Sequence, residues 1–268
     1  MFLAGCGYTG ERCADFFCAD GWDVTALVSS VESARRLAGK PYRVLAADAA
    51  DPDELRTKLA GCGPTGVLIH CLSGKEGRNP AAYRVVYQET LRHLLDSLQP
   101  EFTVFTGSTS VYAQNDATQV DESSPVGGTP TGDILVGAEN LALETGGAAV
   151  RLGAIYGPGR TRFIEAARKS EPSPFGTPDA LINLIHRDDA ASALFHIGSG
   201  RLAGVYNAVD DHPVRRDNLA ESIRSGEPFP PDSRKNSIGK RVKNAKLKST
   251  GWTPRYPCVL DAIRADAA

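Results

Sequence analysis

The 268-residue sequence predicts an α/β fold in which a doubly wound parallel sheet precedes a small, loop-rich C-terminal lobe. Three observations indicate it. A glycine-rich run directly follows a short apolar segment at the N-terminus. Apolar, strand-like segments then alternate with helical ones through the first half of the chain. The second half carries long connections rich in Pro and Gly. Contents of 41% hydrophobic and 23% charged residues are typical of a globular protein.

The glycine-rich run reads Gly5-Cys6-Gly7-Tyr8-Thr9-Gly10, a GxGxxG pattern between an apolar strand at 1–4 and a helix expected from about Glu11. In this context the first glycine permits a tight turn and the second leaves room for a pyrophosphate. The third lets the helix approach the strand. The free N–H groups at the helix N-terminus then face the phosphates. The pattern therefore predicts a Rossmann dinucleotide site; the alternative is an ordinary glycine-rich turn.

The remaining elements of the first half follow in a regular order. Further strands are expected at 22–28, 42–47, 66–72 and 102–106, and helices at 31–38, 51–59 and 87–98. The run at 66–72 is apolar without interruption, which suits a parallel strand covered on both faces. Short connections between alternating strands and helices predict right-handed crossovers.

The second half has a different composition. Helices are expected at 133–143 and 187–197 and a strand at 148–155, with loops at 171–178 and 225–233. We expect a Rossmann domain at 1–160, to which 182–208 returns, and a small substrate lobe formed by 161–181 and 209–268. The basic stretch 234–248 is interpreted as a solvated surface helix and loop; attraction of an anionic substrate is the alternative.

Charge and cysteine usage exclude several classes of protein. The formal net charge of −2 gives no reason to expect a nucleic acid or an anionic membrane as partner. No apolar run has the length of a membrane span, and the chain opens directly into a strand, so no signal peptide is expected. Six cysteines without CxxC pairing and five scattered histidines predict a reducing cytoplasm and no metal site.

Five segments together resemble one known superfamily. They are GCGYTG at 5–10, TGSTSVY at 106–112, RLGAIYGPGR at 151–160, INLIHRDDA at 182–190 and GVYN at 204–207. In this order they resemble the extended short-chain dehydrogenase/reductase superfamily. The closest resemblance is to its atypical branch of NAD(P)-dependent, sugar-nucleotide epimerase/dehydratase-like proteins. The resemblance implies a Rossmann fold and a nicotinamide cofactor, but one scaffold serves many chemistries.

The end of the second strand bears on which nicotinamide cofactor is used. NAD is normally held there by a carboxylate on the ribose 2′-hydroxyl, but this chain has Ser29 and Ser30 instead. Their hydroxyls can donate to a 2′-phosphate, and the side chain of Arg35 or Arg36 on the following helix could reach it. We therefore expect NADP(H), with NAD still possible.

The resemblance extends the predicted cofactor site. It implies that Asp48 meets the adenine amino group, that Cys71 and Leu72 lie along the ribose and pyrophosphate, and that Gly153 lies near the nicotinamide. For Asp48 a simple capping or turn role is equally open. The complete set of predicted cofactor residues is Gly5, Gly7, Tyr8, Thr9, Gly10, Ser29, Ser30, Asp48, Cys71, Leu72 and Gly153.

The catalytic residues depart from the family pattern. In the usual mechanism a Tyr, with its pKa lowered by a Lys, exchanges a proton with the substrate oxygen while a Ser or Thr hydrogen-bonds that oxygen. Ser108 stands at the Ser position. When Glu139 is aligned with the family's Glu, Thr131 and Leu135 fall where Tyr and Lys belong. The Tyr-x-x-x-Lys pair is therefore absent.

Several replacements for the missing pair are open. Tyr112 is the first candidate acid/base, although a packing role is a strong alternative; Tyr156 and His186 are others, and Ser108 with a water is a further one. Arg160, Asn183 and His186 are candidate substrate contacts. Arg160 could equally pair with Glu165 or Asp188 on the surface. Asp188 or Asp189 is expected to cap a helix.

The sequence is compatible with two functions. The first is an NADP(H)-dependent oxidoreductase or epimerase-like enzyme acting on a small polar carbonyl or hydroxyl compound or a nucleotide sugar. The second is a non-catalytic NADP(H)-binding sensor. Either a monomer or a homodimer through the helices at 83–98 and 133–143 is compatible with the pattern.

Overall fold

A computed structural model describes residues 1–74, 79–171, 176–230 and 237–265. The chain divides into two compact units. The first unit comprises Met1–Val111, Val126–Arg151 and Ala191–Tyr206. The second unit comprises Tyr112–Pro125, Leu152–Ala190 and Asn207–Ala268. These units differ from the predicted domains because 112–125, 152–160 and 182–190 group with the C-terminal residues.

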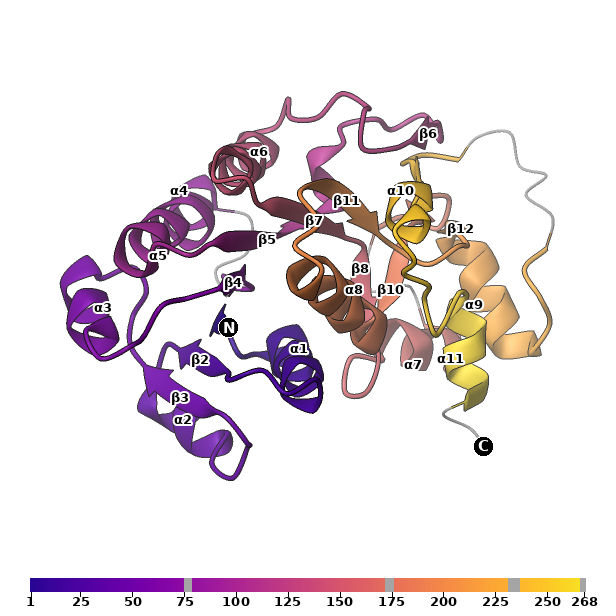
Figure 1. Ribbon diagram of the computed structural model, residues 1–268. Coiled ribbons are helices and arrows are strands. Elements are labelled where there is room, and N and C mark those ends of the chain that lie inside the picture. Colours follow the sequence, from indigo (N-terminus) through magenta and orange to yellow (C-terminus); the bar gives the residue numbers. More distant parts are fainter. Residues whose placement is uncertain (75–78, 172–175, 231–236, 266–268) are drawn as a thin grey trace. The chain divides into compact units, whose positions relative to one another are not determined.

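A seven-stranded sheet forms the centre of the fold, in the order β11-β7-β5-β4-β1-β2-β3 (Figure 1). β1 pairs in parallel with β2 and β4, β2 with β3, and β4 with β5. The order steps outward from β1 in both directions, which confirms the doubly wound α/β fold. Its strands are β1 (Phe2–Ala4), β2 (Thr25–Val28), β3 (Arg43–Ala46), β4 (Val67–His70), β5 (Phe102–Ser108), β7 (Ala148–Leu152) and β11 (Gly204–Ala208).

Helices cover both faces of this sheet. Figure 1 shows α3, α5 and α6 on one face and α1 and α8 on the other. The Phe195 ring of α8 packs edge-on against Phe17 of α1, with ring centroids 5.0 Å apart. The helices are α1 (Tyr8–Ala19), α2 (Val31–Arg36), α3 (Pro52–Leu59), α4 (Pro80–Tyr83), a π-helical stretch (Arg84–Glu89), α5 (Thr90–Leu98), a 3₁₀ turn (Thr109–Val111), α6 (Pro130–Glu144) and α8 (Arg187–Ser199).

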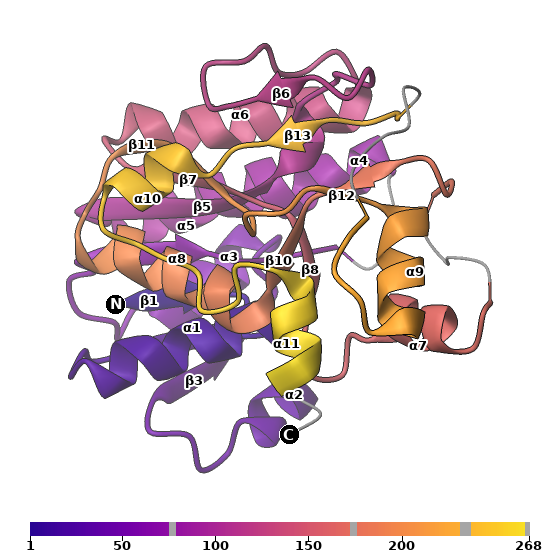
Figure 2. The ribbon, with the colours of Figure 1, turned by 90° about the vertical axis from the view of Figure 1, so that its right-hand side faces the viewer.

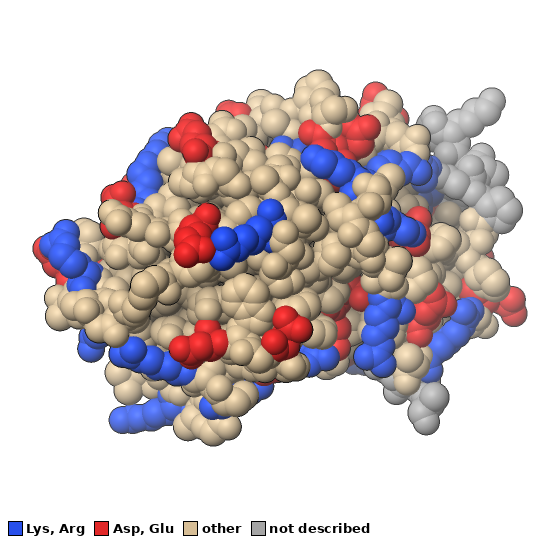
Figure 3. Space-filling model, viewed as in Figure 1, with Lys and Arg blue, Asp and Glu red and all other residues tan. Residues whose placement is uncertain are grey.

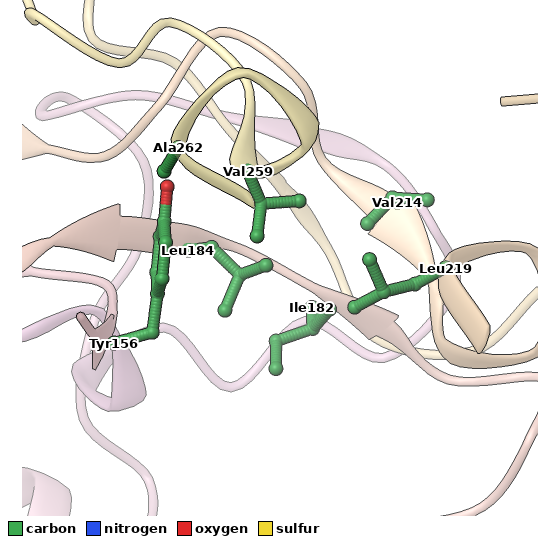
Figure 4. Packing of buried hydrophobic residues seen from close by; sticks show 7 residues of the cluster. All are labelled: Tyr156, Ile182, Leu184, Val214, Leu219, Val259 and Ala262. Carbon is green, nitrogen blue, oxygen red and sulfur yellow. The ribbon is translucent and has the colours of Figure 1, made fainter. Parts of the chain in front are cut away.

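The second unit has its own small sheets and core. β8 pairs in parallel with β10, β9 antiparallel with β12, and β6 in parallel with β13. Its apolar cluster includes Tyr156, Ile182, Leu184, Val214, Leu219, Val259 and Ala262 (Figure 4). The elements are β6 (Gln119–Val120), β8 (Ala154–Tyr156), α7 (Arg162–Arg168), β9 (Leu181–Ile182), β10 (Leu184–His186), β12 (Val214–Arg215), α9 (Arg216–Ser225), β13 (Arg241–Val242), α10 (Ala245–Ser249) and α11 (Val259–Ala265).

The segment after Ser108 is held by the C-terminal part of the second unit. Beside the β6–β13 pairing, the Gly239 N–H donates to the Asn115 side chain at 2.9 Å and the Ala117 N–H to the Gly239 carbonyl at 2.7 Å. The Lys240 ammonium donates to the Tyr112 carbonyl. We call this arrangement, 112–120 against 237–243, the C-terminal clamp. It explains why 112–125 belongs to the second unit.

Several predicted boundaries differ from the structure, and two of these differences bear on the site. α1 begins at Tyr8 rather than near Glu11, because Gly7 occupies the N-cap position and the Glu11 N–H donates to the Gly7 carbonyl at 2.9 Å. The strand predicted at 148–155 breaks at Gly153 into β7 and β8. There the hydrogen-bond partner changes: the Gly153 N–H binds the Ala208 carbonyl and the Ala154 N–H binds the Asn183 carbonyl.

The basic stretch predicted at 234–248 is only partly described, since 231–236 lie outside the described residues. Its remainder forms β13 and α10. On the face drawn in Figure 3, positive and negative side chains are interspersed rather than gathered in a single patch. Within the described residues, no helix combines the length and apolarity needed to cross a membrane.

Candidate functional site

The glycine-rich loop shows why each of its glycines is present. Gly5 has a φ of 96°, and a Cβ there would lie 2.4 Å from the Cys71 carbonyl oxygen. A Cβ on Gly10 would lie 2.1 Å from the Gly5 carbonyl oxygen. Gly7 is different, because a Cβ there would meet no atom within 4 Å. Two glycines are thus demanded by packing, and the third borders open space.

That open space lies at the N-terminus of α1. The helix begins at Tyr8, and its N-cap, Gly7, provides no side-chain cap. Thr9 and Gly10 are buried in the first turn, so α1 packs closely on β1. N–H groups at a helix N-terminus favour anions, and a glycine N-cap lets a phosphate approach the backbone. This cradle, which any side chain on Gly7 would fill, fits a dinucleotide diphosphate.

The serines that follow β2 and the arginines of α2 are the groups predicted to bear on the choice of cofactor, and some of them have local partners. The Ser30 hydroxyl caps α2 by accepting from the Ser33 N–H at 3.2 Å. Ser29 is exposed. Arg36 donates to Glu11 at 2.6 Å and to the Cys6 carbonyl at 3.2 Å, so it lies over the glycine-rich loop. Arg35 is exposed and is the arginine of this pair that these contacts leave available.

Asp48 takes part in a turn. Its carboxylate accepts from the Ala50 N–H at 2.9 Å, and its own N–H donates to Glu54 at 3.1 Å. Asp48 is exposed, so the contact with an adenine stays a prediction beside the turn role. Cys71 and Leu72 follow β4, and their backbone lies against Gly5. Their predicted contacts with the ribose also stay predictions.

Ser108 is the last residue of β5, at the carboxyl edge of the sheet where doubly wound folds bind ligands. Its hydroxyl accepts from the Ser110 N–H at 3.1 Å, which begins the 3₁₀ turn. The preceding residue, Gly107, leaves room for Glu139, whose Oε1 would be 3.2 Å from a Cβ there. The residues that hold Ser108 in place therefore all belong to the first unit.

Glu139 belongs to a buried ion pair that the sequence analysis missed. Arg151 donates to both of its carboxylate oxygens, at 2.9 and 2.6 Å, and the side chains are 4% and 2% exposed. A bidentate pair of this kind connects α6 to β7. An arginine inside the apolar run 148–152 was the available signal, because such a charge requires a buried partner.

Thr131 and Leu135, which stand where the family pattern has Tyr and Lys, both lie in α6. Thr129 caps this helix by accepting from the Gly132 N–H at 3.1 Å. Thr131 lies in the first turn, and Leu135 is 3% exposed in the packed face. Asp133 is in the first turn as expected, where its carboxylate accepts from the Gly128 N–H at 2.8 Å. Hence α6 provides no phenol and no ammonium.

Tyr112 has a structural partner for its hydroxyl. The side chain is 1% exposed, and the hydroxyl donates to the Asn207 side-chain carbonyl at 2.9 Å. Asn207 is fully buried, and its amide donates to the Lys243 carbonyl. To transfer a proton, Tyr112 would have to give up this buried bond. The geometry favours the packing interpretation, and the catalytic role stays a prediction.

Two other candidates, Tyr156 and His186, lie in the core of the second unit. They are 1% and 4% exposed, and their rings meet edge-on with centroids 5.3 Å apart. The Tyr256 ring lies 4.3 Å from that of His186, whose Nδ1 accepts from the Asp188 N–H. Burial raises the pKa of Tyr156 far above its usual range. This environment favours packing over proton transfer.

The predicted substrate contacts also have backbone partners. The Asn183 amide donates to the Lys240 carbonyl at 3.0 Å, and its carbonyl accepts from the Val242 N–H at 2.8 Å. Arg160 closes a tight turn through its N–H on the Gly157 carbonyl. A Cβ on Gly153 would lie 2.7 Å from the Asn183 carbonyl oxygen. These contacts give Asn183 and Gly153 positioning roles; binding to substrate or nicotinamide stays a prediction.

Neither aspartate at the start of α8 is its N-cap. The helix begins at Arg187, which places Asp188 and Asp189 inside the first turn. Asp188 pairs with Arg187 at 3.1 Å. Asp189 is 2% exposed and accepts from the N–H groups of Arg255 and Tyr256. Asp189 therefore holds the segment before α11 rather than its own helix.

Asp210 is a buried carboxyl group with one unused oxygen. It is 2% exposed, and one oxygen accepts from the His212 N–H at 3.2 Å. The other oxygen has no hydrogen-bond partner in the described part of the chain. Burial raises the pKa of Asp210 well above its usual value, and repulsion by Asp211 adds to this.

Asp210→Asn should therefore stabilise the protein in a pH-dependent way. The pKa of Asp210 is higher in the folded state than in the unfolded state. The wild type therefore suffers no penalty from this group below the unfolded pKa of about 4, and it loses stability as the pH rises from there toward the folded pKa. Asn does not ionise, so the variant does not lose this stability at high pH. We expect it to be more stable by about 1–3 kcal/mol at pH 7 and to show little gain near pH 4. Urea unfolding across this range measures it.

The control for this prediction is Asp53→Asn, since the Asp53 side chain is 85% exposed and pairs with Arg56 on the surface. That variant should leave the pH profile of stability unchanged. A gain for Asp210→Asn that is equal at pH 4 and pH 7 would contradict the argument.

Comparison with known proteins agrees with this geometry. The model of the NAD dependent epimerase/dehydratase family matches residues 1–208. A candidate NAD-dependent epimerase/dehydratase from Methylobacillus flagellatus is 26% identical, with a TM-score of 0.81 over 98% of this chain and 96% of that one. A protein of unknown function from Silicibacter pomeroyi is 22% identical, with a TM-score of 0.70 over 99% and 98% of the two chains.

A UDP-galactose 4-epimerase is 16% identical, with a TM-score of 0.72 over 100% of both chains, and at this identity it shows the fold alone. No curated protein matches the sequence. The family model spans the glycine-rich loop, Ser108 and the buried ion pair, and it ends at the last strand of the central sheet. The chain belongs to the NAD dependent epimerase/dehydratase family.

Proposed function

We propose that this member of the family is an NADP(H)-dependent oxidoreductase or epimerase-like enzyme. Its substrate is a small polar carbonyl or hydroxyl compound or a nucleotide sugar. The observation that carries the proposal is the open cradle at Gly7 on the N-terminus of α1. Ser108 at the carboxyl end of β5 adds a hydroxyl where this fold class binds ligands.

The roles of the residues follow from their chemistry. The N–H groups at the start of α1 would hold the diphosphate, and Ser29 and Arg35 would face the 2′-phosphate. When bound, the nicotinamide supplies hydride transfer. The Ser108 hydroxyl would donate a hydrogen bond to the substrate oxygen and polarise the bond to carbon. A water would exchange the proton, because Tyr112 already donates to Asn207.

The choice of NADP(H) rests on the uncharged rim. With Ser29 and Ser30 after β2, no carboxylate there repels a 2′-phosphate, and Arg35 is exposed one helix turn away. Calorimetric titration of the protein with NADPH and NADH tests this. Tighter binding of NADPH supports the proposal, and tighter binding of NADH overturns it.

Ser108→Ala tests the enzymatic role. We expect turnover to fall about 100- to 1,000-fold while the affinity for NADPH stays unchanged, because the hydroxyl acts only on the reacting oxygen. The measurement is stopped-flow oxidation of bound NADPH with a panel of aldehydes and nucleotide sugars. Ser110→Ala is the matched control, since Ser110 contacts Ser108 through its backbone N–H, which the variant retains. Equal turnover of wild type and Ser108→Ala would contradict the role.

Tyr112→Phe separates the two interpretations of that residue. If packing is its role, the variant loses the bond to Asn207 and about 1 kcal/mol of stability but keeps most turnover. A loss of turnover as large as that of Ser108→Ala would instead assign proton transfer to Tyr112.

The second candidate function is a non-catalytic NADP(H) sensor. The observation that favours it is the side chains of Thr131 and Leu135 in α6, where the family pattern has Tyr and Lys. A sensor should bind NADPH, turn over none of the panel and retain its cellular phenotype with Ser108→Ala. Loss of the phenotype in that variant, with cofactor binding retained, would favour the enzyme.

We also propose a cytoplasmic protein, because all six cysteines are free thiols. Its partner is a small-molecule substrate. Size-exclusion chromatography with light scattering decides between a monomer and a homodimer.

A further inference from the structure

A small apolar pocket in the second unit has one cation in its wall. Phe163 and Ala167 of α7 and Ile182 of β9 line one side, and Leu219, Ala220 and Ile223 of α9 line the other, with Arg216 and Glu171 as the charged residues. α7 and α9 lie side by side (Figure 2). The cavity volume is about 30 Å³. That is room for about two water molecules or one small planar group.

One nitrogen of the Arg216 guanidinium lacks the hydrogen-bond acceptor that a buried N–H normally has. Its Nε is buried and has no hydrogen-bond partner in the described part of the chain. Burial lowers the pKa of Arg216, and no carboxylate of the described residues opposes this effect. Gly176 covers part of the group, since a Cβ there would lie 3.0 Å from the Arg216 Nε. A half-buried charge without a counterion is costly unless an anion completes it.

The two arginines that are buried within the described residues show the contrast. Arg215, next in sequence and 5% exposed, donates to both oxygens of Asp217, at 3.0 and 2.8 Å, and to the Ser237 hydroxyl. Arg151 has the same bidentate arrangement with Glu139. Among the described residues, each of these two guanidinium groups is paired with a carboxylate, and none is paired with Arg216.

We propose that Arg216 and the pocket between α7 and α9 bind the carboxylate of a short aliphatic acid or of a small metabolite that ends in one. The planar guanidinium matches a carboxylate with two parallel hydrogen bonds. Phe163, Ile182, Leu219 and Ile223 provide apolar surface for the carbon chain beside it. The small volume selects a group of this size over a bulky ring system.

The experiment uses the full chain in a carboxylate-free buffer of constant ionic strength. Propionate is the probe, propionamide its uncharged isostere, and phosphate the competing anion. Propionate at about ten times its Kd should raise the unfolding midpoint by about 3 °C, whereas propionamide should not. Arg216→Met should abolish the shift. Arg224→Met, which removes an exposed arginine of the same helix, should retain it.

A second readout separates binding from folding. Because no counterion faces Arg216 in the described part of the chain, Arg216→Met should have an unfolding midpoint equal to or above that of the wild type without ligand. Calorimetric titration with propionate should give heat for the wild type and Arg224→Met and none for Arg216→Met. Equal responses to propionate and propionamide, a shift that persists in Arg216→Met, or stronger binding of phosphate than of propionate would each overturn the proposal.

Discussion

Gly7→Asp is expected to abolish dinucleotide binding while the protein still folds. The substitution adds no clash, because a Cβ at this position meets no atom within 4 Å, and φ is −94°. Asp is also a favourable N-cap, so α1 should not be weakened. The new carboxylate would occupy the cradle and repel a diphosphate. One such charge pair costs about 4 kcal/mol near a protein surface, so affinity should fall by a factor of about 1,000.

Calorimetric titration with NADPH measures this loss, and circular dichroism checks the fold. Gly61→Asp is the matched control, because Gly61 also has no atom within 4 Å of a Cβ and is exposed. It adds the same charge outside the glycine-rich loop and should leave the affinity unchanged. If Gly7→Asp bound NADPH as tightly as Gly61→Asp, the cradle would not be the diphosphate site.

Arg151→Met should destabilise the protein by about 3–5 kcal/mol, which is the usual cost of leaving one partner of a buried pair without its counterion. The remaining Glu139 carboxylate is 2% exposed and lies against Gly107. We expect urea denaturation, followed by circular dichroism, to show the loss. Glu139→Gln should be destabilising for the converse reason.

The double variant Glu139→Leu with Arg151→Met separates charge from packing. It removes both buried charges, so most of the stability lost in the single variants should return. If the double variant were as unstable as the sum of the two single variants, the pair would act by shape and volume, and the electrostatic explanation would be wrong.

The central sheet could be predicted from the sequence because its signals are local. Each strand is a short apolar run, and the glycine-rich loop has a pattern specific to one strand–turn–helix context. Where the predicted ends of helices and strands were wrong, packing between residues distant in sequence outweighed local propensity. Gly10 is a poor helix former, yet it belongs to α1 because only a glycine fits against the Gly5 carbonyl.

The second unit was harder to predict because its organising contacts are distant in sequence. Tyr112 and Asn207 are 95 residues apart, and the local sequence around either residue does not predict their hydrogen bond. The break at Gly153 likewise depends on carbonyls of Ala208 and Asn183. The same limitation applied to the candidate site. Ser108 could be predicted from its sequence motif. The hydrogen-bond partners of Asn183 and His186 could be identified only from the structure.

The C-terminal clamp has a consequence for protein engineering. A chimaera that exchanges only the C-terminal lobe with that of a relative would match a foreign β13 to the native β6. Crossover points placed so that 112–125 and 152–190 travel with 207–265 would keep these hydrogen bonds, and the β9–β12 pairing, within one parent. Libraries built for new specificity on this scaffold should therefore exchange the three non-contiguous segments of the second unit together, not the C-terminal segment alone.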